Sequence, residues 1–130
     1  MCGVSGDVTR IVAALFLFVF VSACGPGRYA REARAMTGGD PLRGRTAVSA
    51  YGCDTCHTIP GVATANATVG PPLTQIARRT YLAGRLENTP QNMTRWIRAP
   101  REVDPQTAMP DTGVSVNDAR DIAAYLYTLR

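Results

Sequence analysis

Two cysteines and a histidine with the spacing Cys-x-x-Cys-His occupy positions 53, 56 and 57, and His57 is the one histidine in the 130-residue sequence. Thiols in this order bond covalently to the vinyl groups of a haem, and the adjacent imidazole becomes an axial ligand of the iron. The spacing therefore predicts one haem c, attached through Cys53 and Cys56, with His57 bound to the iron.

Two other chemistries use closely spaced cysteines. A structural zinc ion takes four ligands, and the chain after its first 24 residues offers only these two thiols and the adjacent histidine. A thioredoxin-like disulfide needs a strand and a helix around it, whereas the residues after His57 are rich in Gly, Pro, Ala and Thr. The sequence favours haem attachment over both.

The second axial ligand of the iron must come from elsewhere, because the haem occupies both thiols. Methionine is the natural candidate, and Met36, Met93 and Met109 are available. Met36 lies in a predicted tether, and Met93 lies on a predicted helix face, where methionine usually fills the core. Met109 lies in an irregular stretch that can bring a thioether to the iron opposite the imidazole. We predict Met109 as the ligand, with core packing of Met109 as the alternative.

The first residues have the layout of a secretory signal peptide, which we assign to residues 1–23. An apolar run over residues 11–21 precedes small residues, and it is shorter than the ~20 residues of a membrane span. Residues 21–24, Val-Ser-Ala-Cys, also resemble the lipobox of bacterial lipoproteins. We expect Cys24 to carry a lipid anchor, with ordinary cleavage near Ala23 or an uncleaved apolar anchor as alternatives.

The rest of the chain divides into a linker and one small domain. Residues 24–39 have glycines at both ends and arginines between them, and we predict a flexible tether there. Residues 40–130 form the domain, and roughly 90 residues are few for a core made of protein alone. A haem would supply apolar surface around which so short a chain can pack.

All 14 basic side chains are arginine, and the formal net charge is +4. Such a balance suits nucleic acid, an anionic membrane or an acidic protein, and charge alone does not choose among them. The arginines are spread along the whole chain, and no nucleic-acid-binding module is recognisable. We expect no nucleic-acid partner.

Helix signals dominate the predicted domain. Asp40, Thr89 and Ser115 each precede a helical pattern as N-cap residues, and a proline follows the first two. The predicted helices cover residues 41–51, 73–79 and 90–98 and a last segment that starts at 115, with a loop over 101–114. No convincing strand pattern is present, so the fold class is predicted to be all-α.

The periodicity of two helices predicts how they pack. Gly44 and Val48 lie four residues apart on one face and can meet a partner helix closely. In the last helix Arg120 and Asp121 are expected to face water, opposite a buried stripe. That stripe contains Ala119, Ile122, Ala123, Leu126 and Leu129.

From about residue 40 to 130 the sequence resembles the class I cytochromes c, because several motifs stand in the order of that family. They are Cys-Asp-Thr-Cys-His at 53–57, Gly-Pro-Pro-Leu at 70–73, Trp96-Ile97 with Pro100, Pro-Gln-Thr-Ala-Met-Pro at 105–110, and an amphipathic terminal helix. The resemblance implies the class I cytochrome c fold, with three to five short helices around one covalent haem. It also implies that the first and last helices cross at small residues.

The resemblance assigns roles to residues around the haem. The carbonyl of Pro71 matches one that accepts a hydrogen bond from the imidazole, here that of His57, which would orient the ring and raise its donor strength. Leu73, Trp96 and Ile97 match positions that pack against the haem, and Thr107 matches a threonine that contacts a propionate.

A haem ligated by His and Met has no open coordination position, so we predict a one-electron carrier rather than a catalyst. The resemblance extends to cytochrome domains associated with bacterial terminal oxidases. We therefore expect a membrane respiratory complex as partner, at the periplasmic face of a bacterial membrane, where a lipid anchor raises the local concentration. The alternatives are an electron-acceptor subunit of a periplasmic dehydrogenase and a haem protein whose methionine yields to a gas or peroxide. A docking patch would have to use Arg78, Arg79, Arg95, Arg98 and Arg101.

Overall fold

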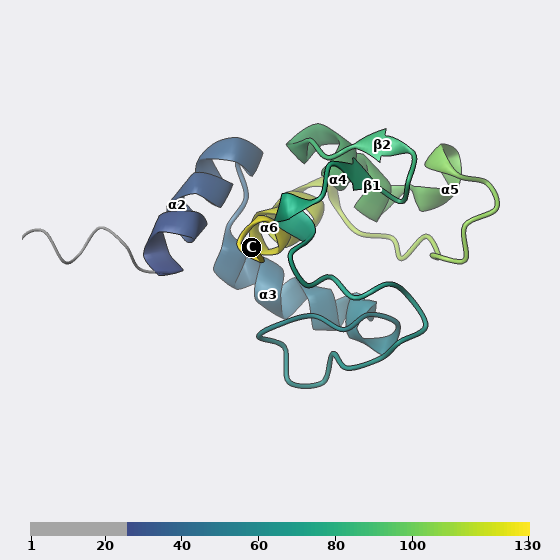
Figure 1. Cartoon of the computed structure of the whole chain (residues 1–130), viewed down its shortest axis with the longest axis horizontal. Helices are drawn as coiled ribbons and strands as arrows, with labels where there is room; N and C mark the ends of the chain where they lie inside the picture. Colours follow the sequence, from purple (N-terminus) through teal and green to yellow (C-terminus); the bar gives the residue numbers. More distant parts are fainter. Residues whose placement is uncertain (1–25) are drawn as a thin grey trace, which may run out of the picture.

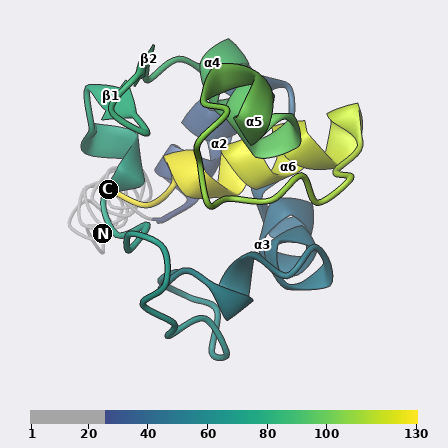
Figure 2. The ribbon, with the colours of Figure 1, turned by 90° about the vertical axis from the view of Figure 1, so that its right-hand side faces the viewer.

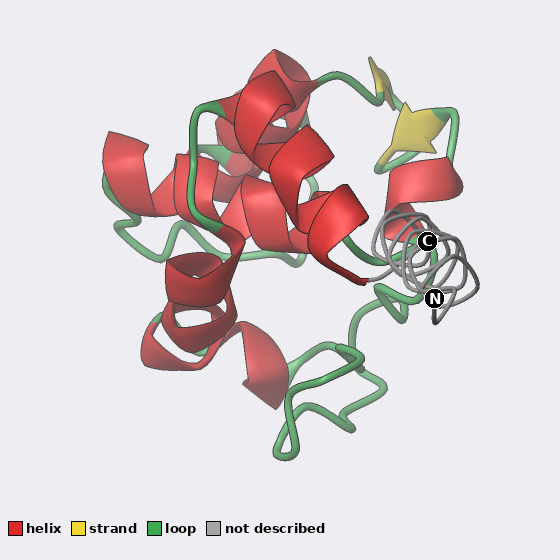
Figure 3. Cartoon of the chain, turned by 90° about the vertical axis from the view of Figure 1, so that its left-hand side faces the viewer, coloured by secondary structure: helices red, strands yellow, loops and turns green. Residues whose placement is uncertain are grey.

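The computed structural model describes residues 26–130 (Figure 1), so the predicted leader and Cys24 lie outside it. Within the described part helices dominate, and the two strands have two residues each (Figure 3). The elements are α2 (Pro26–Thr37), α3 (Pro41–Ala50), the 3-10 helices η2 (Cys53–Thr55) and η3 (Ile76–Arg78), β1 (Tyr81–Leu82), β2 (Leu86–Glu87), α4 (Pro90–Arg98), α5 (Pro100–Val103) and α6 (Val116–Tyr127). This arrangement agrees with the predicted all-α fold of short helices.

Three helices begin at the predicted capping residues. The Asp40 carboxylate accepts hydrogen bonds from the backbone N–H groups of Leu42 and Arg43, at 2.8 and 3.2 Å. The hydroxyl oxygens of Thr89 and Ser115 each accept a bond from the N–H group three residues further on, at 3.2 and 3.1 Å. Local side chains therefore set the first turns of α3, α4 and α6.

Helices α3 and α6 cross at Gly44. A Cβ at this position would lie 1.9 Å from the Asp121 carbonyl oxygen in α6, so only glycine lets the two backbones come this close. Val48, one turn further along α3, and Ile122 in α6 are both buried. The predicted contact of the first and last domain helices at small residues is present. This contact positions the end of α3, after which the turn that begins at Cys53 follows.

The prediction that Asp121 faces water is wrong. Its side chain is buried, and its carboxylate accepts hydrogen bonds from the Asp40 backbone N–H at 2.6 Å and from the Arg43 guanidinium at 2.7 Å. These donors come from the start of α3, which is distant in sequence. The spacing of apolar residues within α6 therefore could not predict that Asp121 has partners there. Arg120 is exposed, as predicted.

The prediction of a flexible tether is wrong over residues 26–37, which form helix α2. This helix packs against α6, and its Ala33 is fully buried. Gly39, just beyond the helix, lies so close to α6 that a Cβ there would be 2.2 Å from the Arg120 carbonyl oxygen. Gly38, with a left-handed backbone, follows the end of the helix, and Gly39 permits the close packing against α6.

Two further elements differ from expectation. The helix predicted over 73–79 is reduced to η3, and Pro100 both follows α4 and begins α5, so the first part of the predicted loop over 101–114 is helical. Strands β1 and β2 pair in antiparallel fashion, with Leu82 opposite Leu86. Strands of two residues are too short to show an alternating pattern in the sequence.

Helix α6 runs through the core of the described residues. Four members of its predicted stripe are buried and the fifth is half-buried, namely Ala119, Ile122, Ala123 and Leu126, and then Leu129. Among residues 26–130, no helix has the length and apolar character needed to cross a membrane.

Candidate functional site

The Cys-x-x-Cys-His segment forms one tight turn directly after α3. Gly52 introduces η2 with a left-handed backbone (φ 72°), a conformation that favours glycine. The backbone N–H groups of Cys56 and His57 both bond to the Cys53 carbonyl oxygen, at 3.3 and 3.0 Å. Both thiols are free and half-buried, and burial raises the pKa of the Cys53 thiol. The turn therefore carries two unpaired thiols beside one imidazole.

The imidazole of His57 is held from behind by the segment 70–71. Its Nδ1 lies 2.7 Å from the Pro71 carbonyl oxygen, and because a carbonyl only accepts, Nδ1 carries the proton and Nε2 keeps its lone pair. Gly70 lies against the ring, where a Cβ would be 2.4 Å from Cε1 and 2.7 Å from Nδ1. The ring is thereby oriented, with its metal-binding nitrogen left available.

Hydrogen bonds and one buried side chain hold the loop between His57 and Pro71 in place. The Leu73 backbone N–H bonds to the Thr58 carbonyl oxygen at 2.8 Å, which brings the two ends of the loop together. Ile59 is buried in the core, and the Tyr125 hydroxyl of α6 donates to the Pro60 carbonyl oxygen. Helix α6 therefore supports the loop that positions the imidazole.

The three methionines have different surroundings. Met93 in α4 is 2 % exposed and belongs to the core, which matches the core-filling role expected of it. Met36 is 41 % exposed on α2. Met109 is half-buried in the irregular segment between α5 and α6, and its backbone N–H bonds to the Thr107 hydroxyl at 3.2 Å. Of the three, only Met109 lies in an irregular segment and has a side chain that is not buried in the core.

The apolar residues that match haem-packing positions are not equally covered. Ile97 in α4 is buried, whereas Leu73 and Trp96 are half-buried. Val69, next to the glycine that touches the imidazole, is 81 % exposed. Leu73 and Val69 lie on the segment whose backbone bonds to Thr58 and Cys56, so part of the apolar surface next to the motif is exposed.

The two loops that carry the candidate ligands lie at the same side of the molecule. Residues 58–72 run along the lower right of Figure 1, and residues 104–114 run along its upper right. Seen from that side in Figure 2, residues 58–72 lie at the bottom of the view and residues 104–114 run down from α5 and along α6. The loop that follows His57 and the segment that contains Met109 therefore lie on one side of the molecule, although about 50 residues of sequence separate the two residues.

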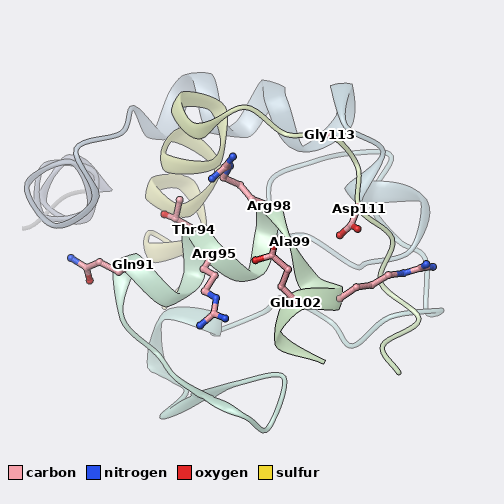
Figure 4. Close-up of a pocket in the computed structure, with 9 residues that line it drawn as sticks. Gln91, Thr94, Arg95, Arg98, Ala99, Glu102, Asp111 and Gly113 are labelled. Atoms are coloured by element: carbon pink, nitrogen blue, oxygen red, sulfur yellow. The ribbon is translucent and has the colours of Figure 1, made fainter. Parts of the chain in front are cut away.

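Three of the five arginines considered for a docking patch, Arg95, Arg98 and Arg101, line one hollow, whereas Arg79 lies beside the imidazole loop. The Arg79 guanidinium donates to the carbonyl oxygens of Pro72 and Thr74 and so braces the loop beside the imidazole. Arg95 and Arg98 line an open hollow on α4, and their side chains point in opposite directions (Figure 4). The hollow also contains acidic groups and none of the candidate haem residues. Its lining residues are Gln91, Thr94, Arg95, Arg98, Ala99, Arg101, Glu102, Asp111 and Gly113.

Reasoning from the sequence missed two supports of the site. Gly70 appeared only as part of a motif, although its missing side chain is what admits the imidazole of His57. Tyr125 was assigned no role at the site, although its hydroxyl donates to the Pro60 carbonyl oxygen and so holds that loop. A period of 3.6 residues identifies the face on which Tyr125 lies, but not the partner of its hydroxyl.

The residues present fit a covalently attached haem. The donors are two free thiols and an imidazole whose Nδ1 is already hydrogen-bonded. They do not fit zinc, because within residues 26–130 no group of three or more His, Cys, Asp or Glu side chains could hold a metal ion. A thioredoxin-like disulfide also lacks its setting, since the motif follows a helix rather than a strand.

Comparison with known proteins agrees with this geometry. One curated relative is "Cytochrome c oxidase subunit 2" of Alkalihalophilus pseudofirmus, which is 34 % identical over 89 residues. These residues make up 68 % of this chain but 25 % of the relative, so the chain matches about a quarter of that protein. No solved structure matches significantly. Residues 42–130 match the family described as "Cytochrome c", and the chain therefore belongs to the cytochrome c family.

Proposed function

We propose that this protein transfers single electrons through one haem attached at Cys53 and Cys56, with His57 and Met109 as the axial ligands of its iron. Membership of the cytochrome c family implies a covalently bound c-type haem and the role of an electron carrier. One observation carries the assignment of this site: the His57 Nδ1 lies 2.7 Å from the Pro71 carbonyl oxygen, beside two free thiols. This bond leaves Nε2 as the nitrogen that can bind iron.

When bound, the haem supplies a one-electron redox couple. The protein holds the axial ligands in place. The Pro71 carbonyl accepts the Nδ1 proton of His57, which fixes the ring and raises its donor strength toward a metal. Thr107 ties the backbone at Met109, since its hydroxyl accepts the Met109 N–H. Because both axial positions would be filled by protein groups, the site suits electron transfer without bond chemistry on a substrate.

We propose a membrane respiratory complex such as a terminal oxidase as the partner. The support is the similarity to residues of a protein named as a cytochrome c oxidase subunit, over 25 % of that protein's length. Anchoring through a lipid on Cys24, at the periplasmic face of a bacterial membrane, is part of the same proposal. It rests on the lipobox-like residues 21–24 in the sequence.

The assignment of Met109 is tested against Met93. In the ferric haem-loaded protein we expect a weak near-infrared band from thioether-to-iron charge transfer, absent in Met109→Ala and present in Met93→Ala. The core variant should instead lose stability by about 2 to 5 kcal/mol, because Met93 is buried. Loss of the band in Met93→Ala but not in Met109→Ala would overturn the assignment. Ready binding of carbon monoxide by the unmodified ferrous protein at neutral pH would favour a gas- or peroxide-binding haem protein instead.

The partner is tested by purifying the haem-containing chain from detergent-solubilised membranes. We expect it to co-purify with an oxidase complex. Co-purification with a dehydrogenase would support the electron-acceptor alternative and refute the oxidase proposal, without affecting the assignment of the haem ligands.

A further inference from the structure

Helix α2 is fixed to the rest of the domain by contacts along its length. Ala33 is fully buried, and Arg34 pairs with Asp40 at 2.5 Å just before α3. The Arg130 guanidinium pairs with Glu32 in the middle of the helix at 2.7 Å and lies 4.8 Å from the centre of the Tyr29 ring in its first half. The helix therefore cannot move far without the domain following it.

The outer face of α2 is basic. Arg28 and Arg31 are exposed, and neither takes part in an ion pair within the described residues. The one acidic residue of the helix, Glu32, is already paired with Arg130. Tyr29 and Met36 lie together on one side of this face and are 40 % and 41 % exposed, with Arg130 over one face of the Tyr29 ring. Two free guanidinium groups with apolar side chains beside them suit an anionic surface that also accepts apolar groups, as a phospholipid headgroup layer does.

The position of α2 in the chain brings it to that surface. Its first residue, Pro26, is two residues beyond Cys24, the proposed lipid-bearing residue. Two residues span at most about 7 Å of extended chain, which is less than the ~8 Å Debye length at physiological ionic strength. A lipid on Cys24 would therefore place the start of α2 within electrostatic reach of the headgroups.

We propose that the outer face of α2, with Arg28 and Arg31, binds anionic phospholipid headgroups and so holds the domain in one orientation on the membrane. Helix α2 lies at the left of Figure 1, whereas residues 58–72 and 104–114 lie at the right. Bound in this way, the domain turns its haem-bearing side away from the bilayer, and a redox partner reaches the haem from that side. This inference rests on the membrane location in the proposed function.

The test uses the full haem-loaded chain, purified from membranes and reconstituted into two kinds of vesicle. One kind contains phosphatidylcholine alone, and the other contains equal parts of phosphatidylcholine and phosphatidylglycerol. Arginine modification by phenylglyoxal, read by mass spectrometry, should slow at Arg28 and Arg31 on the anionic vesicles only. Arg45 on α3, which is also exposed, serves as the reference whose rate stays unchanged. The protection should vanish in 1 M salt, where the Debye length falls to about 3 Å.

Two double variants with equal net charge separate a local effect from a global one. Hydrogen exchange of residues 26–37 should slow by roughly 30-fold on anionic vesicles, because each guanidinium near such a surface contributes about 1 kcal/mol. This slowing should be lost in Arg28→Gln/Arg31→Gln and kept in Arg45→Gln/Arg78→Gln. Equal loss in both variants would refute the proposal.

The remaining outcomes also distinguish the two proposals. If the haem-loaded chain is not recovered with membranes, the membrane location itself fails. If it is recovered with membranes but Arg28 and Arg31 react equally on both kinds of vesicle, the location stands and the α2 surface does not bind lipid. Protection seen only in native membranes, and not on phosphatidylglycerol, would indicate an acidic protein partner and refute the lipid assignment.

Discussion

Replacement of Gly70 by alanine tests how the protein orients the imidazole of His57. A Cβ at this position would lie 2.4 Å from the ring Cε1, whereas ordinary contacts begin at 3.4 Å. The ring or the loop must therefore move by about 1 Å. Gly70 does not have the left-handed backbone found at Gly52, so the effect is one of contact rather than backbone strain.

The expected change in the midpoint potential follows from the hydrogen bond that this movement would break. The distance from His57 Nδ1 to the Pro71 carbonyl oxygen is 2.7 Å, and a shift of about 1 Å along it leaves no hydrogen bond. A bond of this kind contributes about 1 kcal/mol, which for one electron corresponds to roughly 40 mV. Because the bond strengthens His57 as a donor and so favours ferric iron, its loss should raise the midpoint potential by up to about that amount.

The assay is a redox titration of the haem-loaded protein, followed through its visible absorption. Gly27→Ala is the matched control, since a Cβ there meets only the flexible Arg31 side chain at 3.7 Å. The control should leave the potential unchanged, and the ferric magnetic-resonance spectrum should show a reoriented imidazole only in Gly70→Ala. An unchanged potential and spectrum in Gly70→Ala would refute the reasoning that the glycine admits the ring.

Three further predictions concern the fold that carries the site. Gly44→Ala should lower the free energy of unfolding by about 1 to 3 kcal/mol in guanidinium titrations, because the new Cβ would meet the α6 backbone at 1.9 Å. This cost should exceed the gain from the better helix propensity of alanine. A more stable variant would contradict the close crossing of α3 and α6. Asp121→Ala should cost about 1 to 3 kcal/mol in the same titrations, since it removes the buried carboxylate that accepts from the Asp40 backbone N–H and the Arg43 guanidinium, whereas Arg120→Ala on the exposed side should cost little. Burial raises the pKa of Tyr127 to about 12, so the folded chain holds this proton more tightly than the unfolded chain. The free energy of unfolding should therefore fall as the pH rises from about 10 to about 12. Tyr127→Phe should lose less stability over that range.

The sequence alone determined the local starts of the helices and was sufficient to predict the chemistry of the proposed site. The predicted covalent attachment and the predicted axial ligand His57 depend on a contiguous five-residue motif, which spacing alone identifies. The caps at Asp40, Thr89 and Ser115 act over three residues, and the structure contains all three. The family membership that the motifs suggested is confirmed by the match over residues 42–130.

Only the tertiary structure decided the features that depend on contacts between distant segments. The burial of Asp121 depends on donors at the start of α3, and the folding of 26–37 into a docked helix depends on α6 and Arg130. Both predictions failed because helical period and glycine content describe a segment in isolation, whereas burial depends on what lies opposite it. The site combines both kinds of information. The resemblance assigned the Pro71 carbonyl as the partner of His57, and the structure contains that hydrogen bond. Only the tertiary structure showed that the missing side chain of Gly70 makes room for the ring.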